Sequence, residues 1–142
     1  MHRDLKPGNI IFRYDDSLAL TDFGIAQDDS LEESMTATGS VVGTPFYMSP
    51  EQCDGFRADV RSELYALGVI LFEMLAGQRP FTGNSASMVF WQHLSAPIPE
   101  LPWRLSMFQS VIDQLMAKDP ADRYACAGDV VTALEHVPVA DE

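Results

Sequence analysis

The sequence is short of positive charge. Lys and Arg together number 9 against 21 Asp and Glu, which gives a formal net charge of −12 at pH 7. A nucleic-acid-binding domain needs a basic stripe, and an anionic membrane surface attracts basic clusters. We therefore expect no nucleic-acid partner, and we interpret the acidity as that of a solvated protein surface.

Cysteine and long apolar runs are also scarce. Cys53 and Cys126 are the two cysteines, with no Cys-x-x-Cys and no zinc-type spacing, so we expect free thiols in a reducing compartment. The longest apolar run, residues 69–75, is interrupted by Glu73 and is too short to cross a bilayer. The charged first residues are not those of a signal peptide. We predict a cytoplasmic chain without a membrane segment.

The remaining composition is that of a globular domain. The 142 residues are 46% hydrophobic, which is enough for one sizeable core. Apolar residues recur on one face over residues 59–75, and the other faces are also largely apolar, which predicts a buried central helix ending at Gly77. Three further helices are expected over residues 85–94, 107–117 and 127–136, the last with Val130, Val131 and Leu134 as its buried face.

Oxygen-bearing side chains gather near the start of the chain. Asp4 and Asn9 precede a predicted hairpin with strands at residues 10–12 and 18–20, and Asp22 follows it, so the turn-back brings the three together. Carboxylate and amide oxygens suit Mg²⁺. A further carboxylate can orient a hydroxyl and accept its proton. The pattern favours phosphoryl transfer.

These residues resemble two motifs of the protein kinases. Residues 2–9 match H-R-D-L-x-x-x-N without a gap, and residues 22–24 read D-F-G at the family's spacing. Lys6, two places after Asp4, is typical of the serine/threonine branch, and the family resembled is the bacterial-type serine/threonine protein kinases. The resemblance implies that Asp4 is the catalytic base and that Lys6 steadies the transferring phosphate. It also implies that Asn9 and Asp22 bind Mg²⁺, with ATP as the donor and protein Ser/Thr hydroxyls as the acceptors.

A second match lies further along the chain. Residues 43–51 resemble the family's substrate-docking segment, which ends in Ser49-Pro50-Glu51. The resemblance implies that Thr44 hydrogen-bonds Asp4 and Lys6 and favours a Ser or Thr acceptor. Glu51 needs a buried cation, and Arg123 stands where the family supplies one.

The polar segment from residue 26 to residue 42 has no helical or strand period and is expected to be a long loop. In the family this is the activation loop. A phosphate on Thr36 or Thr38 could be held by Arg3 through charge-assisted hydrogen bonds. The alternative is a solvated loop without a regulatory role.

One residue departs from the family pattern. Glu63 stands where the family usually has an Asp that accepts backbone N–H bonds from the catalytic loop. Because Glu is one methylene longer, the loop is displaced or Glu63 bends to make the same bonds.

The expected fold is mainly α: a small hairpin beside the catalytic loop, the buried central helix and three further helices, with the ATP-binding N-lobe absent. Residues 1–137 are predicted to form a partial kinase domain and residues 138–142 a frayed tail. Activity would then need an N-lobe encoded separately. The alternatives are a non-catalytic binding or regulatory fragment and a truncated gene product without function.

Overall fold

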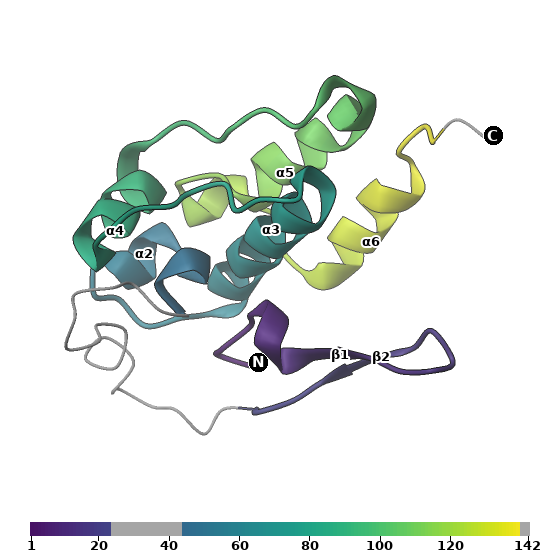
Figure 1. The fold of residues 1–142 in the computed structure, drawn as a ribbon, viewed down its shortest axis with the longest axis horizontal. Helices are drawn as coiled ribbons and strands as arrows, with labels where there is room; N and C mark the ends of the chain where they lie inside the picture. The colour runs from purple at the N-terminus through teal and green to yellow at the C-terminus, as the bar shows by residue number, and fades with distance from the viewer. Residues whose placement is uncertain (24–43, 140–142) are drawn as a thin grey trace.

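The computed structural model describes residues 1–23 and 44–139. A hairpin and the loop before it lie below a group of helices arranged around the central helix α3 (Figure 1). This arrangement confirms the predicted mainly α fold with a small hairpin. The part of the chain that the structure describes adds a one-turn helix, α2 (Pro50–Cys53), and several short 3₁₀ turns.

The hairpin consists of β1 (Ile10–Phe12) and β2 (Leu18–Leu20), which pair antiparallel with Ile11 opposite Ala19. A 3₁₀ turn, η1 (Pro7–Asn9), leads into β1. The connecting turn closes through the N–H of Arg13, which donates to the carbonyl of Ser17 at 2.9 Å. The hairpin therefore returns the chain to the level of Asn9, where it started.

The central helix α3 (Val60–Ala76) begins and ends with strong local signals. Asp59 caps the first turn by accepting the N–H of Ser62, and the Ser62 side chain accepts the N–H of Asp59 in return. Gly77 ends the helix with φ of 74°, a left-handed conformation that glycine adopts without steric cost. The predicted span of residues 59–75 is therefore shifted by one residue.

The remaining helices surround α3. They are α4 (Ala86–Ser95), α5 (Gln109–Leu115) and α6 (Ala127–Glu135), and η3 (Trp103–Phe108) precedes α5. Gly68 lets α3 and α5 approach closely, because a Cβ there would lie 2.8 Å from the Leu115 side chain. On α6 the prediction was wrong for Val131: Val130 is buried, but Val131 is 55% exposed.

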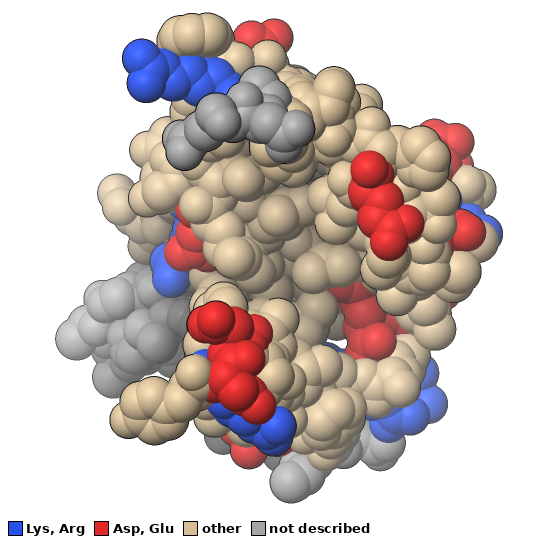
Figure 2. Space-filling view, turned by 90° about the vertical axis from the view of Figure 1, so that its right-hand side faces the viewer, with Lys and Arg blue, Asp and Glu red and all other residues tan. Residues whose placement is uncertain are grey.

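The core lies between α3 and its neighbours. Tyr65, Val69 and Phe72 of α3 are buried with residues of α4 and α5, and a second cluster joins Leu64 to α5 and α6. The described residues contain no helix that is long and apolar enough to span a membrane. The face turned toward the viewer in Figure 2 is hollowed between the hairpin and the helices, and the surface in the hollow is largely uncharged.

Candidate active site

Backbone contacts hold the catalytic-loop segment, residues 2–9. The buried His2 donates through Nε2 to the carbonyl of Thr21 and accepts the N–H of Asp4 at Nδ1, at 3.3 Å. Arg3 has φ of 72°, and its N–H donates to the Glu63 carboxylate on α3. Of the two alternatives for Glu63, the structure shows the second: the Glu63 side chain reaches the loop and accepts the N–H of Arg3.

Asp4, Lys6 and Asn9 form one polar cluster. The Lys6 Nζ lies 3.3 Å from Asp4 Oδ2. The Asn9 Nδ2 donates to the carbonyl oxygen of Asp4 at 2.9 Å and to Asp4 Oδ2 at 3.3 Å. Asn9 is buried, whereas the Asp4 and Lys6 side chains are 25% and 31% exposed. The cluster is therefore anchored on its inner side and open on its outer side.

Asp22 follows directly on the strand that ends beside this cluster. The N–H of Thr21 donates to the carbonyl of Asn9 at 2.9 Å, so Asp22 begins one residue from that contact. Asp22 has φ of 57° and an exposed side chain. For a residue other than glycine such a backbone conformation is uncommon, and it often marks a functional turn.

The donor atoms near Asn9 and Asp22 fit Mg²⁺. The Asn9 amide nitrogen is used by Asp4, which leaves its Oδ1 as the free donor, and Asp22 supplies carboxylate oxygens. Among residues 1–23 and 44–139, no three His, Cys, Asp or Glu side chains form a group that could hold a metal. An ion here would thus have few protein ligands and would rely on water and phosphate oxygens, as Mg²⁺ commonly does.

A pocket separates the polar cluster from the docking segment. Asp4 and Lys6 line it on one side, Tyr47 and Met48 on another, and Glu63 at the start of α3. Tyr47 ends the 3₁₀ turn η2 (Thr44–Tyr47).

Several sequence-predicted residues lie outside the described part. These are Thr36, Thr38 and Gly24, together with the side chain of Thr44, whose backbone begins η2. Arg3, the predicted partner of a phosphate on the loop, is exposed at the pocket's edge.

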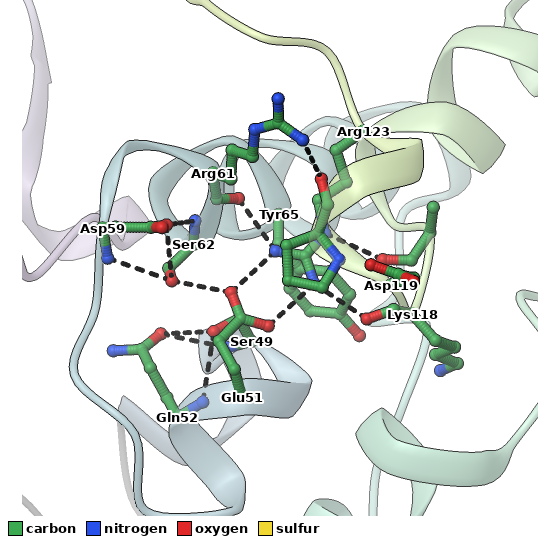
Figure 3. A network of polar contacts seen from close by, with 12 residues as sticks. Ser49, Glu51, Gln52, Asp59, Arg61, Ser62, Tyr65, Lys118, Asp119 and Arg123 are labelled. Carbon is green, nitrogen blue, oxygen red and sulfur yellow. Dashed lines mark hydrogen bonds and ion pairs between the residues drawn. The ribbon is translucent and has the colours of Figure 1, made fainter.

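Glu51 and Arg123 lie together, as Figure 3 shows. The Arg123 Nη1 and Nη2 donate to the two Glu51 carboxylate oxygens at 2.7 and 2.8 Å. Burial by itself raises the Glu51 pKa, but hydrogen bonds from Arg123 and Ser62 outweigh it and lower that pKa to about 2. Glu51 is therefore ionised and paired throughout the neutral range.

The remaining Arg123 donors bind backbone oxygens. They reach the carbonyls of Ala117, Lys118 and Arg61 at 2.8, 3.1 and 3.0 Å. All five N–H groups of the guanidinium are thus used. This network joins α2, the start of α3 and the segment before α6. It thereby anchors the end of the docking segment, residues 43–51, at Glu51.

Sequence reasoning missed Ser62, which donates to Glu51 at 2.7 Å. The capping spacing Asp59-x-x-Ser62 could have located it at the first turn of α3. This capping spacing does not predict the hydrogen bond between Ser62 and Glu51. Reasoning also missed the contacts of Tyr47 with Glu73, at 2.6 Å, and with Arg79, at 3.3 Å.

Comparison with known proteins accounts for this arrangement. The family described as protein kinase domain matches residues 1–136. The chain is 45% identical over 141 residues to the probable serine/threonine-protein kinase PknB of Bifidobacterium longum, covering 93% of this chain and 20% of that protein. It is 43% identical over 134 residues to the serine/threonine-protein kinase PrkC of Bacillus subtilis, covering 92% and 20%.

A third relative is the serine/threonine-protein kinase PknL of Mycobacterium tuberculosis, 40% identical over 131 residues, with 89% of this chain and 33% of that protein covered. The chain therefore spans about a fifth to a third of the length of these relatives. Since the family match covers nearly the whole sequence and includes both motifs of the site, this chain belongs to the protein kinase family.

Proposed function

We propose that this chain carries the phosphate-transfer site of a serine/threonine protein kinase. The observation that carries the proposal is the Asp4 carboxylate oxygen 3.3 Å from both Lys6 Nζ and Asn9 Nδ2, on a side that is partly open to solvent. Asp4 orients the Ser or Thr hydroxyl of a protein substrate and accepts its proton.

Lys6 has a complementary role. Its ammonium group is a point charge beside Asp4, and it steadies the transferring phosphoryl group while the hydroxyl attacks. Lys6 and Asn9 both contact Oδ2 of Asp4, and these contacts limit the orientation of the Asp4 carboxylate. Such preorganisation matters because a small misplacement of catalytic groups costs a large rate factor.

Mg-ATP is the proposed donor. Asn9 and Asp22 would hold Mg²⁺, and Lys6 would contact the phosphates with them. When bound, the ion neutralises charge on the phosphates. The support is the chemistry of the two side chains and the backbone contact that sets the Asp22 turn beside Asn9.

Two further roles follow from the family. By the family pattern Thr44 would contact Asp4 and Lys6 and so favour Ser or Thr as acceptor. A phosphate on Thr36 or Thr38 is bound by Arg3, which is exposed at the pocket. The two cysteines are free thiols, which supports a cytoplasmic location.

A partner polypeptide that supplies the ATP-binding lobe is part of this proposal. Phe12 and Leu18, which lie opposite each other in the hairpin, are 67% and 58% exposed. In the described ranges no element covers these apolar side chains, and larger exposed apolar patches commonly mark interaction sites. The same observation favours the second candidate, a non-catalytic fragment that binds another protein through this surface.

Titration calorimetry with Mg-ATP and phosphate transfer to a degenerate Ser/Thr peptide distinguish the two candidates. For the chain alone or with an added ATP-binding lobe, we expect transfer that falls at least ~100-fold in Asp4→Asn. Asp16→Asn is the matched control, because Asp16 is an exposed aspartate in the hairpin turn. Transfer that is unchanged in Asp4→Asn would remove the assigned role, and the absence of both heat and transfer would leave the binding fragment.

A further inference from the structure

Arg79, just beyond the end of α3, contacts three side chains at once. Its guanidinium carbon lies 4.0 Å from the centre of the Phe46 ring. Its Nε donates to the Tyr47 hydroxyl at 3.3 Å and lies 3.7 Å from a Glu73 carboxylate oxygen. The Tyr47 hydroxyl in turn donates to the other Glu73 oxygen at 2.6 Å. We call these four residues the Arg79 clamp.

The clamp joins two segments that are far apart in the sequence. Phe46 and Tyr47 belong to η2, whereas Glu73 lies in the last turn of α3. Both aromatic residues are 6% exposed, and Tyr47 lines the same pocket as Asp4. The position of this wall therefore depends on where Arg79 holds the two rings.

The chemistry of the clamp requires arginine. A planar guanidinium can stack on one ring while its edge binds a hydroxyl and a carboxylate, which a lysine ammonium cannot do in the same geometry. A simple surface ion pair would contribute little, since the Arg79 and Glu73 side chains are 37% and 29% exposed. The stacking on Phe46 and the hydrogen bond to Tyr47 instead fix the orientation of the Arg79 guanidinium relative to η2.

We propose that Arg79 is a positioning residue that holds η2 in the orientation needed to dock the acceptor peptide. The proposal rests on the proposed function, because it assigns the pocket wall to peptide binding. Glu73 is satisfied within the protein by Tyr47 and Arg79. A basic side chain of a substrate would therefore have to compete with Arg79 for this carboxylate.

Amide hydrogen exchange on the full chain tests the clamp without any turnover. In Arg79→Met we expect exchange at residues 46–48 to rise roughly tenfold, with a smaller rise in Arg79→Lys, because local opening follows the loss of local contacts. Arg104→Met is the matched control, since Arg104 also stacks on an aromatic ring, Trp103 at 5.3 Å, but on η3. No rise at residues 46–48, or an equal rise in the interior of α3, would overturn the clamp.

Peptide kinetics test the docking role. In the transfer assay described above, KM for the acceptor peptide rises roughly tenfold in Arg79→Met, as expected for lost ground-state binding. KM for ATP stays unchanged, and Arg79→Lys is intermediate. A lower kcat with unchanged peptide KM would contradict the docking role. If the wild-type chain transfers no phosphate, the proposed function fails, and the exchange experiment alone decides whether the clamp exists.

Discussion

The helical body and the hairpin differ in how their apolar side chains are covered. In the body Ile112, Leu115 and Val69 have no exposed surface. In the hairpin Phe12 is 67% exposed, and Leu5 and Ile10 are the residues near it that pack partly on the core. The body thus buries its apolar side chains within itself, whereas the hairpin that positions Asn9 and Asp22 leaves its own largely exposed. The stability of the chain should therefore depend mainly on the packing of the body, and the hairpin beside the proposed transfer site should contribute little to it.

The polar contacts differ in the same way. Arg123 in the body is 3% exposed, and every one of its N–H groups has a partner. The Lys6–Asp4 pair beside the hairpin is partly open to solvent. Buried contacts in which every donor is paired stabilise one structure, whereas a partly exposed pair can still contact another molecule.

The largest expected effect comes from breaking the network of the body. Arg123→Met leaves the Glu51 carboxylate without its cation, and losing one partner of a buried pair costs about 3–5 kcal/mol. Urea unfolding followed by circular dichroism measures the loss. The double variant Glu51→Gln with Arg123→Met should be less unstable than the sum of the single changes. A loss below about 1 kcal/mol in Arg123→Met would mean that the pair contributes little.

A matched pair of truncations sharpens the comparison directly. Ile112→Ala removes a fully buried side chain and should lower the free energy of unfolding by about 3 kcal/mol. Phe12→Ala removes a larger side chain that is mostly exposed, so the loss should stay below about 0.5 kcal/mol. The same urea titration measures both. Equal losses would show that the hairpin is buried in the folded chain.

A pH dependence smaller than the effect of breaking the buried pair tests whether a buried side chain of the body can take up a proton. His93 is fully buried, hydrogen-bonded to the Tyr65 hydroxyl at 2.8 Å, and its Nε2 has no partner among the described residues. Burial, and then the nearby Lys118 charge, lower the His93 pKa from 6.5 to about 4.

The direction in which stability changes with pH follows from the linkage between protonation and folding. The unfolded chain binds a proton at His93 near pH 6.5, and the folded chain does so only near pH 4, so stability is full above pH 6.5 and falls as the pH drops toward 4. Between pH 7 and pH 5.5 the loss attributable to His93 is about 1.4 kcal/mol. His93→Gln should show no such dependence in thermal melts over this range. An identical slope in the variant would assign the pH dependence to other groups.

The elements that depend on local sequence could be predicted. The apolar periodicity, Asp59 and Gly77 located α3 to within one residue. The short separation of Asp4 and Asn9 made their contact predictable, because five residues containing a proline turn cannot carry them far apart.

The features that could not be predicted are contacts between segments that lie far apart in the sequence. The carbonyls that Arg123 binds belong to residues 61, 117 and 118, and no local pattern marks a carbonyl as an acceptor. Val131 repeats the apolar spacing of α6 but is exposed, because a short helix at the edge of the body packs only one narrow face. The Arg79 clamp likewise joins segments about thirty residues apart.

The full use of the Arg123 guanidinium limits how this position can change during evolution. Lysine would keep the charge but would bring three N–H groups to five acceptor atoms. Ser62 would still donate to one Glu51 oxygen, but the paired contact of the guanidinium with both carboxylate oxygens would be lost. A substitution that keeps the charge would therefore still weaken the network.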